Sequence, residues 1–347
     1  MTDLRPGRPD LPEAVGSEAP SPPVLRLGVL GTLVWDRILG QSGGPELVEE
    51  WGGISYAMEA LSVALPEEWV MSPILKVGED LAGPALDYLA SIPRLEMNSG
   101  VQVVPFPNHR VELRYHDQSR RSESLSGGTP PWTWEELEPL LRRVDALYLN
   151  FITGLEMGVE TARHFRDRFP APLYADLHSL FQGLSSDGQR FPRELPHRGA
   201  WLRVFDAVQM NEQEFELLGR STGNPWELAA ETVGPDLKLI AVTLGPKGGA
   251  FVAAPEFTSN PESWPSTRSS PRSEGATRTG LSPLSDEPSS GDPTGCGDVW
   301  GATFFARLLG GDPLEKAMVT ANRMAAKKVE FSGARGLRHH LRGVLAV

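Results

Sequence analysis

Short apolar runs that end in small or polar residues recur along the chain and predict the buried strands of a parallel sheet. The first covers residues 24–32, and later runs cover residues 146–150, 172–178 and 238–243. Near-continuous apolar runs of this length are typical of strands that are covered on both faces. Residues 54–64 instead combine alanines with spaced large apolar side chains, which predicts a helix packed on that sheet.

Residues 101–123 show a different pattern, in which apolar and polar side chains alternate. Val111 and Leu113 fall on one face of an extended chain, whereas Arg110 falls on the other. This alternation predicts a half-buried antiparallel strand. A charged side chain on such a strand normally faces solvent, and the alternative is that Arg110 reaches a ligand.

Two segments lack any apolar period. Residues 1–23 contain six prolines, and residues 255–291 contain six prolines and ten serines. Segments of this composition bury too little apolar surface to offset the entropy of ordering. We therefore expect a disordered tail at 1–23, an ordered domain from 24 to 347, and within it a solvated low-complexity insertion at 255–291.

Composition excludes several classes of protein. The 347 residues are 40% hydrophobic and 22% charged, with a net charge of −12 and one cysteine. An acidic chain lacks the basic face that nucleic acids or anionic membranes need, and a single cysteine forms no internal disulfide. No apolar run is long enough for a membrane span, and the first residues lack the pattern of a signal peptide. We therefore expect a cytoplasmic protein with no nucleic-acid or membrane partner.

The candidate chemistry centres on residues 291–298. Gly295, Cys296 and Gly297 allow a tight turn whose N–H groups converge at the start of an apolar helix, an arrangement that binds anions. Asp298 lies in the first turn of that helix, where a carboxylate can take a proton from a hydroxyl that attacks a bound phosphate. The alternative is an ordinary helix start with an acidic residue in its first turn.

Further polar residues follow the predicted strands. Asp36 lies just beyond the first strand, and Gly52 and Gly53 precede the helix at 54–64. Ligands of open α/β sheets bind at such strand ends. Asn211 and Glu214 lie one turn apart at another helix start, where they either form a capping box or serve a site.

The order of these motifs resembles that of the ribokinase-like (PfkB) carbohydrate and nucleoside kinase family. The resemblance covers residues 24–347 apart from the insertion, and residues 291–298 are similar to the family signature D-T-x-G-A-G-D. Four positions depart from the family pattern, namely Ala57, His178, Pro293 and Cys296. The change at Ala57 removes an amide that would bind an acceptor hydroxyl, so the acceptor is left open.

The resemblance implies a doubly wound, mostly parallel sheet flanked by helices, with a small β lid from parts of 33–50 and 100–125. It also implies a kinase that transfers phosphate from ATP to a hydroxyl of a sugar or nucleoside. The implied roles are catalysis by Asp298 with the anion hole Gly295, Cys296 and Gly297; acceptor binding by Asp36, Gly52, Gly53 and Arg110; nucleotide binding by Thr243, Gly245, Gly248 and Asn322; water-mediated Mg²⁺ binding by Asn211 and Glu214; and binding of a monovalent cation such as K⁺ by Asp292 and Thr294.

Two further points stay open at the level of sequence. The departures from the family pattern leave a second hypothesis, a catalytically silent protein that binds sugar or nucleotide with the same fold. The resemblance also allows a homodimer formed through the lid.

Overall fold

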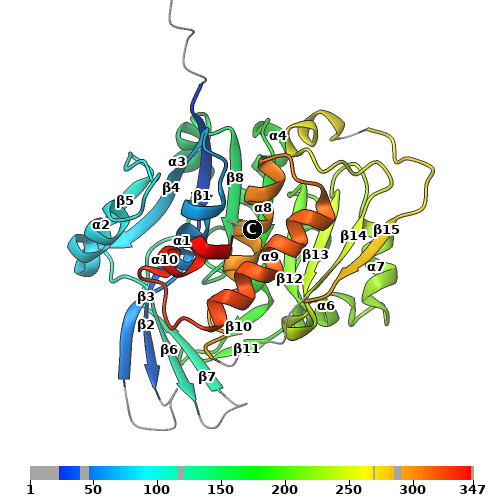
Figure 1. The fold of residues 1–347 in the computed structure, drawn as a ribbon. Coiled ribbons are helices and arrows are strands. Elements are labelled where there is room, and N and C mark those ends of the chain that lie inside the picture. The colour runs from blue at the N-terminus through cyan, green and yellow to red at the C-terminus, as the bar shows by residue number, and fades with distance from the viewer. Residues whose placement is uncertain (1–22, 40–46, 116–120, 269, 285–290, 345–347) are drawn as a thin grey trace, which may run out of the picture.

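The computed structural model describes residues 23–39, 47–115, 121–268, 270–284 and 291–344. Within these residues, nine strands form a large sheet in the order β15-β14-β13-β12-β9-β8-β1-β4-β5, and four form a second sheet in the order β3-β2-β6-β7. The second sheet projects from one end of the body in Figure 1. The predicted tail at 1–23 lies almost entirely outside the described residues.

The strands of the large sheet are β1 (Leu25–Leu30), β4 (Trp69–Gly78), β5 (Val101–Val104), β8 (Ala146–Asn150), β9 (Leu173–Asp176), β12 (Ala207–Asn211), β13 (Leu239–Thr243), β14 (Gly249–Ala253) and β15 (Arg278–Ser282). The helices are α1 (Ile54–Ala64), α2 (Ala82–Ala90), α3 (Trp134–Leu141), α4 (Val159–Arg168), α5 (Arg198–Trp201), α6 (Glu212–Gly219), α7 (Pro225–Thr232), α8 (Cys296–Leu309), α9 (Leu314–Val329) and α10 (Leu337–Leu341).

In the large sheet, the seven neighbouring strands β5, β4, β1, β8, β9, β12 and β13 run parallel to one another. Strands β14 and β15 add an antiparallel edge beside β13. Side chains on the two faces of this sheet belong to two separate apolar clusters. One contains residues of α1, α2, α8, α9 and α10, and the other contains residues of α3 to α7. Helices therefore cover both faces, which confirms the expected doubly wound, mostly parallel sheet.

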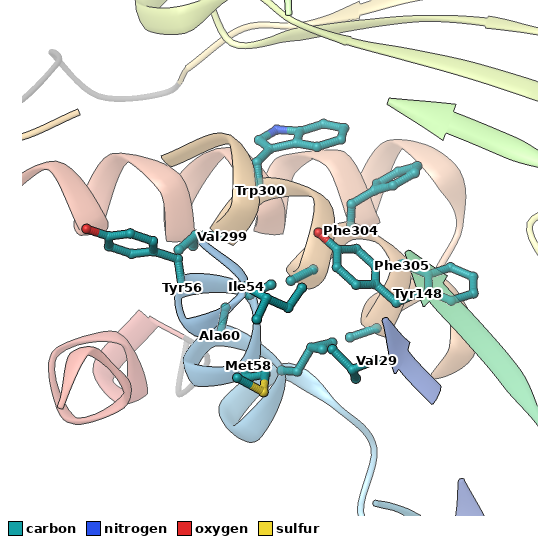
Figure 2. Packing of buried hydrophobic residues seen from close by; sticks show 14 of the residues in the cluster. Val29, Ile54, Tyr56, Met58, Ala60, Tyr148, Val299, Trp300, Phe304 and Phe305 are labelled. Carbon is teal, nitrogen blue, oxygen red and sulfur yellow. The ribbon is translucent and has the colours of Figure 1, made fainter. Parts of the chain in front are cut away.

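Helix α1 occupies the residues predicted from its apolar pattern. It packs against α8, and Figure 2 shows Ile54 and Tyr56 on α1 close to Val299 on α8. On the sheet side of α8, Phe304 and Phe305 contact the ring of Tyr174 with centroids 6.0 and 5.1 Å apart. Full burial of one large apolar side chain stabilises the fold by about 1.5 to 3 kcal/mol, so α8 is held firmly between α1 and the sheet.

The small sheet, which we call the lid, consists of β2 (Leu33–Leu39), β3 (Leu47–Gly53), β6 (Arg110–Tyr115) and β7 (Arg121–Ser126). A hairpin of β10 (Gln182–Leu184) and β11 (Arg190–Pro192) joins it, because the Leu125 N–H donates to the Gly188 carbonyl at 2.9 Å. The lid strands overlap the regions 33–50 and 100–125, but β3 extends to Gly53 and β7 to Ser126. Residues 101–104, within the range assigned to it, instead form β5 of the large sheet.

The expectation of a solvated insertion at 255–291 is wrong for much of the segment that the structure describes. Residues 278–282 form β15, which pairs with β14. Phe257 and Trp264 are only 7% and 1% exposed, and the Trp264 ring stacks on Phe305 of α8. A composition rich in proline and serine concealed these anchors, because one or two aromatic side chains suffice to hold a loop on the core.

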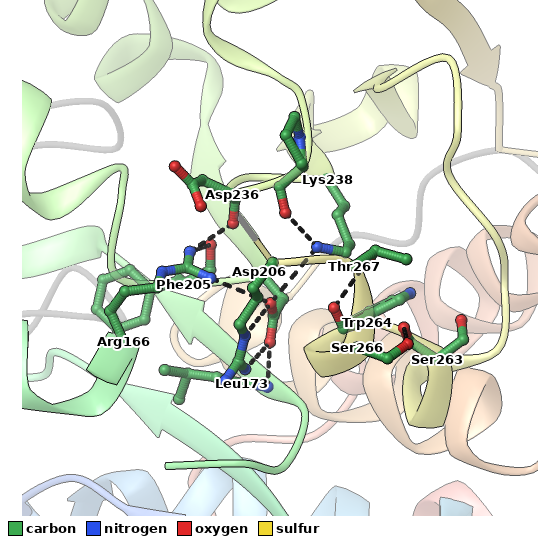
Figure 3. Close-up of polar contacts among 12 residues, drawn as sticks. Arg166, Leu173, Phe205, Asp206, Asp236, Lys238, Ser263, Trp264, Ser266 and Thr267 are labelled. Atoms are coloured by element: carbon green, nitrogen blue, oxygen red, sulfur yellow. Dashed lines mark hydrogen bonds and ion pairs between the residues drawn. The ribbon is translucent and has the colours of Figure 1, made fainter. Parts of the chain in front are cut away.

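A buried carboxylate fixes the same segment at a second point. Asp206 is 0% exposed, and its carboxylate accepts from the Arg268 guanidinium, with Nε at 2.8 Å from Oδ1, and from the Leu173 N–H at 3.0 Å. Arg166 and Lys238 also converge on this carboxylate, as Figure 3 shows. Removal of one partner from such a buried ion pair is strongly destabilising. Arg268 therefore holds the insertion against the start of β12, which Asp206 directly precedes.

Among the described residues, no helix has the length and apolar character needed to cross a membrane.

Candidate functional site

The structure places the predicted anion-binding turn at the first turn of α8. Gly295 is the N-cap with φ of 79°, a left-handed conformation that glycine adopts without strain. A side chain at this position would also collide with the Tyr56 ring, since an added Cβ would lie 2.4 Å from it. The Cys296 N–H donates to the Pro293 carbonyl at 3.2 Å, so this N–H closes the turn. The other N–H groups of the first helical turn have no partner within the helix by its geometry, which suits an anion.

A glutamine that the sequence analysis did not identify holds this turn on the sheet. The Gln209 side chain comes from β12, donates from Nε2 to the Gly297 carbonyl at 2.9 Å and accepts from the Tyr174 hydroxyl at 2.8 Å. Gln209 is 2% exposed, its bond to Tyr174 is buried, and its bond to Gly297 is partly buried. The start of α8 is therefore positioned by a hydrogen-bond chain.

Asp298 lies next to this turn and faces the end of β8. Asn150, the last residue of β8, donates from Nδ2 to Asp298 Oδ1 at 2.6 Å. Burial raises the pKa of Asp298 to about 6, although His178, Asn150 and Lys328 act in the opposite direction. A carboxyl group with this pKa is ionised at neutral pH and is a stronger base than an ordinary aspartate.

A cluster of charged groups surrounds Asp298 at the carboxyl edge of the sheet. The His178 ring, just beyond β9, lies with Nδ1 at 2.6 Å from Glu214 Oε1. Burial alone lowers the pKa of His178, but Glu214, Asp176 and Asp298 outweigh it and raise the value. His178 therefore adds a positive charge beside the carboxylates of Asp176, Glu214 and Asp298.

Asn211 and Glu214 form the capping box of α6. The Glu214 N–H donates to Asn211 Oδ1 at 2.9 Å, and the Asn211 N–H donates to Glu214 Oε2 at 2.8 Å. Both residues also line the cavity beside Asp298. Asn211 and Glu214 therefore cap α6 and at the same time line the cavity. No group of three or more His, Cys, Asp or Glu side chains among the described residues has the geometry of a metal site.

A cavity of about 590 Å³ lies between the carboxyl edge of the large sheet and the lid. Asp36 on β2 lines it together with Asp298, and Asp36 is 4% exposed. A Cβ added to Gly52 would lie 1.7 Å from Asp36 Oδ2, so the carboxylate packs directly on this glycine. Burial, with the charges of Glu123, Glu50 and Asp298, raises the pKa of Asp36 well above its usual value. The structure thus places Asp36 against Gly52, and Gly53 lines the same cavity.

The prediction that Arg110 binds the acceptor does not agree with the structure. Its guanidinium pairs with Asp80 at 2.7 Å and donates to the Asn108 carbonyl at 3.2 Å. The next residue along, Val111, lines the cavity, so the alternation of β6 turns Arg110 away from it.

The arginine that does line this cavity is Arg190 on β11. Its side chain is 5% exposed, forms an ion pair with Glu123 on β7 and donates to the Ile152 carbonyl at 2.9 Å. Neither Arg190 nor Glu123 was identified from the sequence, because their segments show no motif and meet only through the contact of the hairpin with the lid.

A second cavity of about 540 Å³ adjoins the first across the α8 turn. Cys296 and Gly297 line both cavities, and the second is bounded mainly by apolar groups. The predicted nucleotide residues all line this second cavity, namely Thr243, Gly245, Gly248 and Asn322. The Asn322 amide is already engaged, since it accepts from Trp300 Nε1 at 2.7 Å and donates to the Ser282 carbonyl at 2.8 Å.

Asp292 and Thr294 lie just before the α8 turn. The Thr294 N–H donates to Asp292 Oδ1 at 2.9 Å, and the Asp292 N–H donates to the Val329 carbonyl at 2.8 Å. The loop before α8 is therefore attached to the end of α9.

No family model and no curated protein sequence matches the chain. Solved structures do resemble it in three dimensions. A pyrophosphate-dependent kinase in the ribokinase family is 17% identical, with a TM-score of 0.68 over 91% of this chain and 99% of that chain. The ribokinase of Thermotoga maritima is 19% identical, with a TM-score of 0.67 over 92% and 99%. A nucleoside kinase of Burkholderia thailandensis, solved with inosine, is 16% identical, with a TM-score of 0.65 over 91% and 96%. The chain therefore has a ribokinase-like fold.

Proposed function

We propose that this chain is an ATP-dependent kinase that phosphorylates a hydroxyl group of a small sugar or nucleoside. One observation carries the proposal: the α8 turn, with Cys296 and Gly297, separates two cavities, and Asp298 lines the first of them. A donor in the second cavity and an acceptor in the first would meet at a helix N-terminus, beside a base. Phosphoryl transfer needs this combination of positioning and charge stabilisation.

In the proposed reaction, the acceptor hydroxyl oxygen attacks the γ-phosphorus of ATP. The bond from that phosphorus to the bridging oxygen breaks, ADP leaves with the electron pair, and the hydroxyl proton passes to Asp298. Asn150 orients the Asp298 carboxylate through their hydrogen bond of 2.6 Å. The first turn of α8 stabilises the negative charge that develops on the transferred group.

The shape of the second cavity supports a nucleotide donor. Trp300, Ala325 and Val329 contribute to its walls, and such a mainly apolar space suits an adenine base. Pyrophosphate has no group that would fill it. Among the solved structures, an Arabidopsis thaliana ribokinase is described with ribose and ATP.

The residues near the turn fit Mg²⁺ only through water. Both Glu214 oxygens already accept hydrogen bonds, Oε1 from Asn211 Nδ2 and His178 and Oε2 from the Asn211 N–H. Mg²⁺ commonly keeps several waters and binds phosphate oxygens, so Asn211 and Glu214 would position those waters. The ion would supply neutralisation of the phosphate charge.

The first cavity suits a polyol. Asp36 and Glu123 offer carboxylate acceptors for hydroxyl groups, whereas Val111 and Leu113 of β6 provide an apolar wall. A sugar or nucleoside presents both kinds of surface, with hydroxyl groups at its rim and carbon–hydrogen faces between them.

The test is release of ADP from Mg·ATP in the presence of ribose, inosine or myo-inositol, which are ligands of structurally similar kinases. Pyrophosphate is tried as a second donor. Activity that Asp298→Asn removes would support the proposal. A catalytically silent binding protein would instead show ligand-induced thermal shifts with ATP and an acceptor but would release no ADP.

A further inference from the structure

A lysine is buried directly behind the α8 turn. Lys328 lies near the end of α9, its side chain is 0% exposed, and its Nζ lies 5.3 Å from the centroid of the Tyr56 ring. Burial of an unpaired ammonium group costs several kcal/mol, so a lysine in such a place needs oxygen partners and a strong structural reason.

Three oxygens from two loops surround this ammonium group. Lys328 Nζ lies 2.8 Å from the Phe331 carbonyl, 3.2 Å from the Asp292 carbonyl and 3.5 Å from Asp292 Oδ2. An ammonium group has three protons to donate, and each of them has a partner here. The partners come from the loop before α8 and the loop after α9.

Carbonyl and carboxylate oxygens that converge from two loops are also the ligands that hard cations prefer. The sequence resemblance placed a monovalent cation at Asp292 and Thr294. The Lys328 nitrogen contacts the carbonyl and Oδ2 of Asp292, one of the two residues predicted for that ion, and so occupies oxygens that the ion would use. The residues present therefore do not fit a bound K⁺ beside an intact Lys328.

The ammonium group is connected to the anion-binding turn in two ways. Asp292, which accepts from it, also accepts the Thr294 N–H one residue before Gly295. Tyr56 packs between Lys328 and Gly295, since its ring lies against both. A positive charge at this position also lowers the pKa values of Asp298, Cys296 and Glu50 against the effect of burial.

We propose that the Lys328 ammonium group is a built-in substitute for a monovalent cation. It ties the loop before α8 to the end of α9 and supplies a permanent positive charge behind the turn, so the protein needs no K⁺. The effect of this charge on phosphoryl transfer rests on the proposed function. The tie between the loop before α8 and the end of α9 does not.

The first experiment compares the unmodified protein in potassium, sodium and choline chloride at about 0.1 M each, so that screening is equal. We expect the same Tm in the three salts to within about 1 °C, because no site gains a ligand. ADP release, if present, should also agree within about twofold. A Tm higher in potassium by about 3 °C or more would overturn the inference, since an ion would then bind the folded protein.

The second experiment creates the site that the lysine fills. Lys328→Ala should lower Tm in choline, and potassium or methylammonium should restore part of the loss by entering the vacated space. Lys327→Ala is the matched control, because Lys327 is only partly buried and its Nζ pairs with Glu330 at 2.5 Å. Its Tm should not depend on the cation. A folded Lys328→Ala variant whose Tm is identical in potassium, methylammonium and choline chloride would contradict the inference.

Lys328→Met covers the case in which the alanine variant does not fold. It keeps an apolar stem but removes the charge, so ADP should bind at least about tenfold more weakly than to the Lys327→Met control. Equal ADP affinity of the two variants would refute the proposed charge effect. These readouts are melting temperature and nucleotide binding, so they remain decisive even if no acceptor is phosphorylated.

Discussion

Replacement of Asp298 by asparagine should remove activity and at the same time stabilise the folded protein. The amide keeps the shape of the carboxyl group, and its oxygen still accepts from Asn150 Nδ2. The negative charge is lost. If Asp298 is the general base, the rate of phosphoryl transfer falls by about 10² to 10⁴-fold.

The gain in stability follows from the pKa of the same group. Burial raises the pKa of Asp298 from an ordinary value of 3.8 to about 6. This difference corresponds to at most about 3 kcal/mol of stability lost on ionisation. Because the side chain borders an open cavity, water reduces the effect, and we expect about 1 to 3 kcal/mol. At about 2 °C for each kcal/mol, Tm rises by about 2 to 6 °C.

The sign of the pH dependence is fixed by these pKa values. A raised pKa means that the folded state binds the proton more tightly than the unfolded chain, so ionisation of Asp298 destabilises the fold. The cost is present in full above pH 6 and disappears below pH 4. The Tm difference between Asp298→Asn and the unmodified protein should therefore be positive at pH 7.5 and vanish as the pH approaches 4. The activity of the unmodified protein should fall below about pH 6.

Thermal melts of both proteins across this pH range test the reasoning, with Asp312→Asn as a control of opposite sign. Although burial opposes ionisation, Arg307 and Lys316 lower the pKa of Asp312. Asp312→Asn should therefore lower Tm at pH 7.5. A decrease in Tm for Asp298→Asn would refute the reasoning that ionisation of Asp298 destabilises the folded protein. An increase in Tm that is the same at pH 7.5 and pH 4 would refute it as well.

Three further outcomes are expected. Arg268→Ala leaves Asp206 with a lost partner and should lower Tm by about 6 to 10 °C, whereas the exposed Arg272→Ala should change Tm by about 1 °C or less; equal melts of the two variants would remove the anchoring role of Arg268. Asp36→Ala should raise the acceptor KM by about 10 to 150-fold with an unaltered thermal shift by ATP, and equal losses for both ligands would indicate a structural role instead. Burial raises the pKa of the Cys296 thiol to about 12, so iodoacetamide at pH 8 should alkylate it at least about tenfold more slowly than a free thiol; rapid labelling of the ligand-free protein would contradict this environment.

The sequence was sufficient for those features that depend on local pattern. Helix α1 begins and ends at the predicted residues, since a glycine pair and a run of apolar residues define both its start and its buried face. The alternation in β6 likewise gave the correct two faces, and the more common solvent-facing interpretation of Arg110 agrees with its ion pair to Asp80.

Features that depend on distant segments were not predictable in the same way. Trp264 and Arg268 lie in a segment rich in proline, serine and threonine, and their burial depends on Phe305 and Asp206. Arg190 meets Glu123 across a hairpin and the lid. The two members of each pair lie far apart in the sequence. Because each side chain is buried only through contact with its partner, neither segment alone predicts the pair.

The two cavities differ in what surrounds them, and this difference bears on how substrate preference can change over time. The second cavity is built on α8, whose aromatic side chains belong to the main apolar cluster, so a substitution there disturbs the whole domain. Part of the first cavity is built on the lid, which projects from the body, and on Arg190 of the β10–β11 hairpin. Val111 and Leu113 of the lid belong to that same cluster, so we expect the lower cost to folding at the polar lining positions of these strands. We therefore expect differences in small-molecule preference to arise from polar positions of the lid and the hairpin rather than from α8.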